Sequence, residues 1–96
     1  MTDGLLLGID IGTSSSKGVL VSPDGEVLAQ ASRPHRTSTP RPGWVEHDAE
    51  TVWWADFTAI AGDLVDAAGG RALAGLGVSG IGPCVLAADG HGRPLR

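Results

Sequence analysis

Apolar residues in the first third of the chain follow the spacing of β-strands. An almost unbroken apolar run over residues 5–11 is too short for a helix and predicts a buried strand. Residues 17–22 predict a second strand. The stretch Ser22-Pro23-Asp24-Gly25 is typical of a tight turn, because proline presets φ and glycine accepts a left-handed conformation. Residues 26–31 are therefore predicted to form a third strand that completes a hairpin.

The middle of the chain changes to helical spacing. Three prolines within residues 32–47 disfavour regular structure and predict a surface loop. Asp48 is then placed to cap a helix, and Gly69-Gly70 to end it. Apolar residues recur between these two points at intervals of three or four, which puts them on one face of a helix. They are Trp53, Phe57, Ile60, Leu64 and Ala68.

The last quarter of the chain returns to strand patterns. Residues 72–78 predict a buried strand and residues 84–88 another, followed by a turn at 89–92. The order strand, strand, strand, helix, strand, strand predicts an α/β fold in which a helix packs on one face of a mixed sheet. The sequence stops at Arg96, where a further strand is expected. We therefore expect a domain that is incomplete at its C-terminal end.

Composition narrows the classes of partner. The 96 residues are 42% hydrophobic and 19% charged, which indicates a folded domain. A net charge of -4 argues against nucleic acid or an anionic membrane as partner. The single cysteine, Cys84, is interpreted as a small buried residue that forms no internal disulfide. No signal-peptide pattern or apolar run of roughly 20 residues is present, so we expect a cytoplasmic protein.

Two glycine-rich stretches invite comparison with nucleotide-binding motifs. A Walker loop requires glycine directly before its lysine, but Ser16 precedes Lys17. Residues 75–80 have the spacing G-x-G-x-x-G, yet the pattern that follows them, Ile81-Gly82-Pro83, is not helical, as a dinucleotide site would require. We therefore assign neither a Walker loop nor a dinucleotide-binding motif to this sequence.

The stretch GIDIGTSSSKGVLV, residues 8–21, offers another route to phosphate. Two strands joined by a turn of small residues can direct N–H groups and hydroxyls at an anion. Gly12 would allow close approach, residues 13–15 would supply donors, and Lys17 could meet a phosphate. Asp10 would hold Mg²⁺ or its waters, because that ion prefers hard oxygen ligands. The alternative is that the hydroxyls only cap a hairpin turn, and chemistry alone leaves both interpretations open.

The remaining histidines and tryptophans give weaker signals. His35, His47 and His91 are too scattered to predict a metal site and are interpreted as surface residues. Trp44 lies in a proline-rich loop, where a large aromatic side chain needs a pocket or a ligand to cover it.

Three blocks of sequence together resemble a known family over essentially the entire chain. They are GIDIGTSSSKGVLVSPDGEVLAQAS, RPGWVEHDAETVWWADF and GLGVSGIGPCVLAADGHGRPLR. In order and spacing they resemble the N-terminal end of FGGY carbohydrate kinases, with xylulokinases and related sugar kinases closest. The first block is shared with actin-like ATPases, heat-shock chaperone ATPases and hexokinases, whereas the second is much more specific. The resemblance implies an ATP-dependent kinase that phosphorylates a sugar or polyol hydroxyl between two domains of ribonuclease-H-like (actin-like ATPase) fold.

The resemblance also implies roles for single residues. Asp10 is similar to the family's metal-organising aspartate, which implies Mg²⁺ as well as ATP as cofactors. Gly12 and Thr13 would form the turn that lets the ATP phosphates approach. Ser14 and Ser15 would make further phosphate contacts, and Lys17 would lie near the phosphates. Residues 1–96 would be the N-terminal part of the first kinase domain, and the full-length enzyme could be a homodimer.

The sequence departs from the family where relatives contact substrate. Xylulokinases have glutamine, methionine and histidine there, and glycerol kinases glutamine, arginine and glutamate, whereas this chain has Ile81, Gly82 and Pro83. Gly82 and Pro83 are still the expected substrate-binding positions, but the motif fixes neither D-xylulose nor glycerol as substrate. The family's catalytic base is expected downstream of Arg96, so residues 1–96 alone are not expected to turn over. The alternative is a non-catalytic nucleotide-binding or interaction module.

Overall fold

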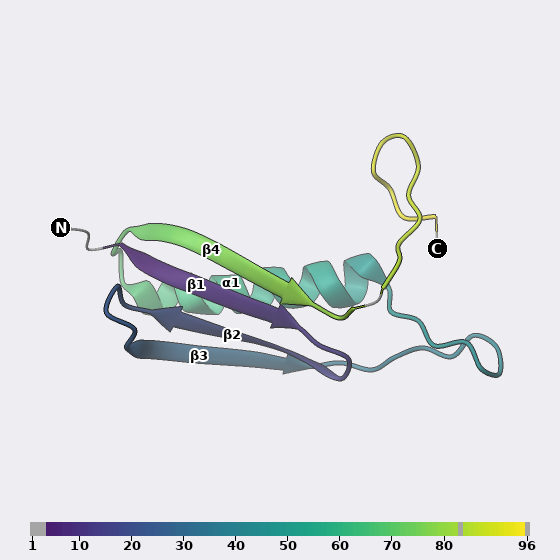
Figure 1. The fold of residues 1–96 in the computed structure, drawn as a ribbon, viewed down its shortest axis with the longest axis horizontal. Helices are drawn as coiled ribbons and strands as arrows, with labels where there is room; N and C mark the ends of the chain where they lie inside the picture. Colours follow the sequence, from purple (N-terminus) through teal and green to yellow (C-terminus); the bar gives the residue numbers. More distant parts are fainter. Residues whose placement is uncertain (1–3, 83, 96) are drawn as a thin grey trace.

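A four-stranded sheet with a helix on one face forms the body of the molecule (Figure 1). The computed structural model describes residues 4–82 and 84–95. Its elements, in chain order, are β1 (Leu5–Ile11), β2 (Ser15–Val21), β3 (Val27–Pro34), a π-type helical segment η1 (Ala49–Trp54), α1 (Ala55–Ala68) and β4 (Leu73–Gly80). The strands lie in the order β3-β2-β1-β4. β1 and β2 pair antiparallel, as do β2 and β3, whereas β4 runs parallel to β1, which confirms the predicted mixed sheet and the predicted order of elements up to β4.

The first three strands form a meander whose second turn was predicted correctly. The Ser22 N–H donates to the Glu26 carbonyl over 2.9 Å, and Gly25 takes φ 93°, a left-handed conformation that favours glycine. β2 begins two residues earlier than predicted, at Ser15, and β3 continues to Pro34. Pairing between the two strands extends to both of these residues, which accounts for the longer strands.

The core lies between α1 and one face of the sheet. Alternate residues of β1 point to this face because successive strand side chains point to opposite sides. The helix contributes the last three residues of the predicted apolar stripe, and Trp53 and Phe57 pack against its edge. The buried apolar residues are Leu5, Leu7, Ile9, Ile11, Leu20, Ile60, Leu64 and Ala68. Gly18 permits the close helix packing, since a Cβ there would lie 2.4 Å from Ile60 Cγ2.

Both predicted helix ends are confirmed. Asp48 Oδ1 accepts the backbone N–H groups of Glu50 and Thr51, each over 2.9 Å, and caps η1. These contacts lower the pKa of Asp48, that with Thr51 most strongly. Gly69 ends α1 with φ 61°.

Within the described residues, no helix is both long enough and apolar enough to cross a bilayer.

β4 is an uncovered edge strand, so the prediction of a strand here is confirmed but its predicted burial is wrong. The helix contacts β1, β2 and β3, and all eight residues of β4 are exposed. The strand carries Leu73, Leu76 and Val78 but no charged residue or proline, the features with which proteins usually protect an open edge. The face of the sheet beside β1 therefore presents apolar surface.

The prediction of a strand at residues 84–88 is wrong. The segment instead joins a small loop in which Ala88 makes an isolated antiparallel bridge with Pro94. The Asp89 carboxylate closes that loop by accepting the N–H groups of His91 and Arg93, so pairing stays local. Cys84 is exposed rather than buried, because no element covers the segment that carries it.

Candidate phosphate-binding site

Asp10, the predicted metal-organising residue, lies on the sheet face opposite α1. Its strand neighbours across the sheet are Lys17 on β2 and Ser79 on β4, so the three side chains share this face. The Ser79 hydroxyl donates to Asp10 Oδ1 over 2.7 Å. Ser79 was not among the predicted site residues, because its role depends on the parallel pairing of β4 with β1. The hydrogen bond orients the carboxylate, and Lys17 adds a positive charge next to it.

The turn between β1 and β2, residues 12–14, adjoins this carboxylate. The Gly12 N–H donates to the Ser15 carbonyl over 2.9 Å, and a Cβ on Gly12 would lie 2.7 Å from that oxygen. Gly12 is therefore required on steric grounds by the turn itself. Thr13 and Ser14 are exposed and Ser15 is half-buried, so the hydroxyls of the first two residues are accessible to a ligand.

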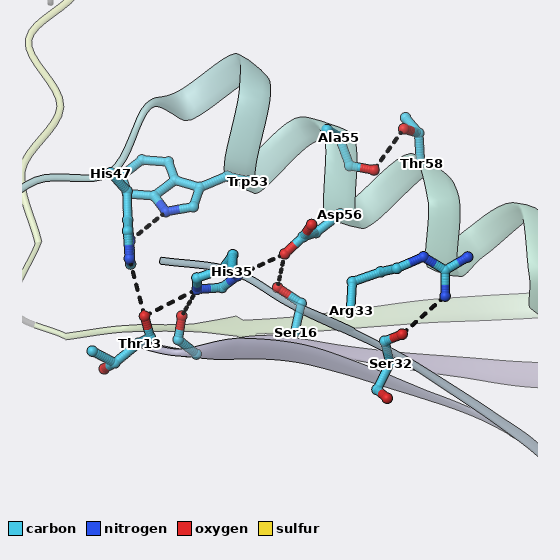
Figure 2. A network of polar contacts seen from close by, with 11 residues as sticks. Thr13, Ser16, Ser32, Arg33, His35, His47, Trp53, Ala55, Asp56 and Thr58 are labelled. Atoms are coloured by element: carbon cyan, nitrogen blue, oxygen red, sulfur yellow. Dashed lines mark hydrogen bonds and ion pairs between the residues drawn. The ribbon is translucent and has the colours of Figure 1, made fainter. Parts of the chain in front are cut away.

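Two histidines lie together behind this turn, contrary to the interpretation of both as scattered surface residues (Figure 2). The ring centroids of His35 and His47 are 4.8 Å apart with the rings nearly perpendicular. His35 Nε2 lies 2.8 Å from the Gly12 carbonyl and 3.0 Å from the Thr13 carbonyl, and His47 Nε2 lies 3.0 Å from the Thr13 carbonyl. The loop after β3 brings the rings together. Only His91 matches the prediction, exposed in the C-terminal turn.

Each imidazole is fixed by a partner on its other ring nitrogen. His35 Nδ1 lies 2.7 Å from Asp56 Oδ2, an oxygen that also accepts the Ser16 hydroxyl over 2.7 Å. His47 Nδ1 accepts the indole N–H of Trp53 over 3.1 Å. The side chains of His35 and Asp56 are only 5% and 11% exposed, so water does little to loosen this contact.

The histidines determine which way the turn presents its peptide groups. In a trans peptide the carbonyl of one residue and the N–H of the next point in opposite directions. Because the Gly12 and Thr13 carbonyls face the imidazoles, the N–H groups of Thr13 and Ser14 face away from them. N–H groups of a turn can bind an anion where they converge on one point, and these two lie on the side of the turn away from the histidines.

A sequence signal for this network existed. Asp56 lies on the i, i+4 stripe that continues through Ile60, Leu64 and Ala68, and Ser16 lies on the core-facing side of β2. Polar groups at buried positions require hydrogen-bond partners. The two positions therefore pointed to a buried polar contact, although the sequence does not reveal that His35 completes it.

A cavity of about 440 Å³ opens on the other side of His47. Its walls include Thr13, Trp53 and Ile81, so it adjoins the β1–β2 turn. Gly82, a predicted substrate-binding residue, directly follows Ile81 in the chain and is exposed. Pro83, the other predicted position, lies outside the described residues. The Arg41 guanidinium lies 5.0 Å from the ring centroid of Trp44, and the tryptophan remains 40% exposed.

The side chains beside Asp10 on this sheet face are the Ser79 hydroxyl and the Lys17 ammonium. Within the described residues no group of three or more His, Cys, Asp or Glu side chains could hold a metal ion. Mg²⁺ is commonly held by one or two carboxylates together with waters and substrate phosphates, so a single oriented carboxylate suits it. Asp10 is exposed and Ser79 contacts its Oδ1 atom, which is compatible with a hydrated cation at the carboxylate.

Comparison with known proteins places the whole unit in one family. The model of the FGGY family of carbohydrate kinases, N-terminal domain, matches residues 5–96, and the chain belongs to this family. Among curated proteins, it is 37% identical over 81 residues to a glycerol kinase of Chromobacterium violaceum, a match that covers 82% of this chain and 16% of the relative. A glycerol kinase of Citrifermentans bemidjiense is 43% identical over 76 residues, covering 77% of this chain and 15% of the relative.

A solved structure confirms the fold. Xylulose kinase from Rhodospirillum rubrum superposes with a TM-score of 0.88 at 38% identity, covering 96% of this chain and 19% of that protein. The sheet and helix therefore form part of the actin-like ATPase fold, as predicted. The chain thus spans less than a fifth of the length of these relatives.

Proposed function

We propose that this chain supplies the N-terminal part of the first domain of an ATP-dependent carbohydrate kinase. The observation that carries the proposal is the Asp10 carboxylate, oriented by Ser79, beside a turn in which the Thr13 and Ser14 N–H groups face away from the two histidines. This is the arrangement that phosphoryl transfer needs from a protein, since its catalysis is mostly positioning and charge neutralisation.

Each element of the site would then have a role toward ATP. The Thr13 and Ser14 N–H groups and hydroxyls would bind phosphate oxygens, and Gly12 would let them approach. Ser15 would add a further contact at the start of β2. Lys17, in register with Asp10, would neutralise phosphate charge from the open sheet face. A Mg²⁺ ion held through Asp10 would supply charge neutralisation at the phosphates.

The acceptor would be a sugar or polyol. The cavity beside Thr13, Trp53 and Ile81 is large enough for a small carbohydrate, and Gly82 follows its wall. Ile81 and Gly82 offer no side-chain hydrogen bond, and the same holds for Pro83. Specificity would therefore come from other parts of the cavity. The acceptor hydroxyl would attack the γ-phosphorus of ATP, the bond from that phosphorus to the bridging oxygen of ADP would break, and the hydroxyl proton would pass to a base from the rest of the enzyme.

Magnesium-dependent phosphate binding tests the proposed half-site. Isothermal titration of the 96-residue chain with inorganic pyrophosphate, with and without Mg²⁺, should show binding that Mg²⁺ strengthens. Asp10→Asn should remove most of the Mg²⁺ effect, about tenfold or more in affinity, because a contact to a charged group contributes about 1.5–3 kcal/mol. Asp66→Asn, on the exposed side of α1, is the matched control and should bind as the wild type does.

Two results would count against the proposal. Equal Mg²⁺ dependence in the Asp10→Asn and wild-type chains would remove the role of Asp10. Pyrophosphate binding without any transfer of phosphate to a sugar or polyol, by the chain joined to the remainder of a kinase, would favour the non-catalytic nucleotide-binding module instead.

A further inference from the structure

Two histidines donate to the same turn, yet their surroundings require different protonation states. His35 and His47 both place Nε2 3.0 Å from the Thr13 carbonyl oxygen. A carbonyl oxygen only accepts hydrogen bonds, so both Nε2 atoms must carry a proton. The difference between the rings lies at Nδ1.

The partner of His47 fixes it as a neutral ring. The indole nitrogen of Trp53 has a proton and no available lone pair, so it can only donate. His47 Nδ1, 3.1 Å away, must accept that proton and is therefore unprotonated. His47 is the Nε2–H tautomer, and both of its ring nitrogens are satisfied.

The partner of His35 requires the opposite. As a carboxylate, Asp56 only accepts hydrogen bonds, and its Oδ2 atom already accepts the hydroxyl of the fully buried Ser16. His35 Nδ1, 2.7 Å from it, must then donate, as Nε2 does toward Gly12 and Thr13. A ring with a single proton would turn a lone pair toward an acceptor oxygen at one end, with its side chain only 5% exposed and little water to relieve it.

We infer that His35 is a doubly protonated positioning residue, paired with the Asp56 carboxylate, that holds the Gly12 and Thr13 carbonyls and so directs the N–H groups of Thr13 and Ser14 toward a phosphate. The inference rests on the proposed function for the identity of the ligand. Asp56 and His47 are the titratable groups in contact with the ring. On neighbouring β3, Arg33 is paired with Asp63 of α1 over 2.6 Å.

Nitrogen NMR of the histidine rings tests the protonation state directly. In the ¹⁵N-labelled chain at pH 7, long-range ¹H–¹⁵N correlations should show two protonated ring nitrogens for His35. His47 should show one protonated and one unprotonated nitrogen. Asp56→Asn, which keeps the side-chain shape and removes the charge, should return His35 to a ring with one unprotonated nitrogen. An unprotonated nitrogen on His35 in the wild-type chain would overturn the inference, whatever the phosphate affinity.

Pyrophosphate titration of histidine variants tests the positioning role. His35→Phe should weaken binding about tenfold or more, since charge-assisted hydrogen bonds to the turn are lost. His35→Gln, whose amide N–H can still donate to the carbonyls, should recover part of the affinity. His91→Phe, in the exposed C-terminal turn, is the control and should leave affinity unchanged.

The two proposals fail in different ways. Wild-type affinity in His35→Phe, with amide shifts of Thr13 and Ser14 that respond normally to pyrophosphate, would overturn the positioning role alone. Absence of any pyrophosphate binding by the wild-type chain would contradict the proposed function, while the ring spectrum would still decide the protonation state of His35.

Discussion

Replacement of Gly12 by alanine should disturb the candidate phosphate-binding site, because the β1–β2 turn has no room for the added methyl group. The added Cβ would lie 2.7 Å from the Ser15 carbonyl oxygen, about 0.7 Å short of the 3.4 Å at which ordinary contact begins. The obstacle is backbone, so a side-chain rotation cannot relieve it. The turn must move by about this amount.

The size of the effect follows from the bonds tied to that peptide. The Gly12 N–H bond to Ser15 is 2.9 Å long and the His35 contact with the Gly12 carbonyl is 2.8 Å. A displacement of about 0.7 Å takes either one beyond the 2.7–3.2 Å range of a normal hydrogen bond. Loss of one to two such bonds costs about 1–3 kcal/mol, which corresponds to roughly 5- to 150-fold in pyrophosphate affinity.

Paired titrations and thermal melts would measure this effect. Gly90→Ala is the matched control, because a Cβ there meets nothing within 4 Å and its φ is not left-handed. Gly12→Ala should bind pyrophosphate more weakly and melt lower, and Gly90→Ala should match the wild type in both. Wild-type affinity and melting temperature in Gly12→Ala would refute the steric argument.

Three further changes test the packing and the charges around the sheet. Gly18→Ala should lower stability by about 1–3 kcal/mol, because its Cβ would lie 2.4 Å from a core methyl group, whereas Gly77→Ala, with open space around it, should unfold at the wild-type urea concentration. Asp48→Ala should lower Tm at pH 7 and Asp48→Asn should not, since asparagine also caps helices. The pKa of Asp48 is below its ordinary 3.8 in the folded chain, so its stabilisation is present above pH 3.8 and is lost as the pH falls through the lowered value. A Tm difference between wild type and Asp48→Ala that persists at pH 2 would contradict this. Arg33→Ala should lower the free energy of unfolding by under about 1 kcal/mol, and by less in high salt, because the side chains of Arg33 and its partner Asp63 are 39% and 49% exposed. A larger decrease in urea unfolding that does not depend on salt would disprove this prediction.

The secondary structure near the N-terminus could be predicted because its signals are local. The turn at Ser22 and the helix cap at Asp48 are defined by residues within four positions of each other. Asp10 and Gly12 could be singled out for a similar reason, because the carboxylate ends one strand and the glycine starts the turn that follows. Their roles toward metal and phosphate remain predictions.

The contacts that complete the site could not be predicted, because they join distant parts of the chain. His35 reaches back 23 residues to Gly12, and Asp56 reaches back 40 residues to Ser16. The His35 contact depends on the path of the proline-rich loop, which has no regular pattern, and the Ser16 contact depends on how α1 packs against β2. Cys84 was wrongly predicted to be buried because its apolar neighbours resemble a buried strand. In the structure the segment forms no strand, and Cys84 is exposed.

The parallel pairing of β1 with β4 has a consequence for the order of folding. β1, β2 and β3 can associate through short hairpins, whereas the hydrogen bond from Ser79 to Asp10 joins residues 69 positions apart. Closing so long a loop costs more chain entropy than closing a hairpin, so β4 should dock after the meander and the helix have formed. Pulsed hydrogen exchange should then show the amides of β1 to β3 protected before those of β4. On this order, a chain emerging from the ribosome forms the β1–β2 turn early, and the Asp10 carboxylate gains its hydrogen bond from Ser79 only when β4 joins the sheet.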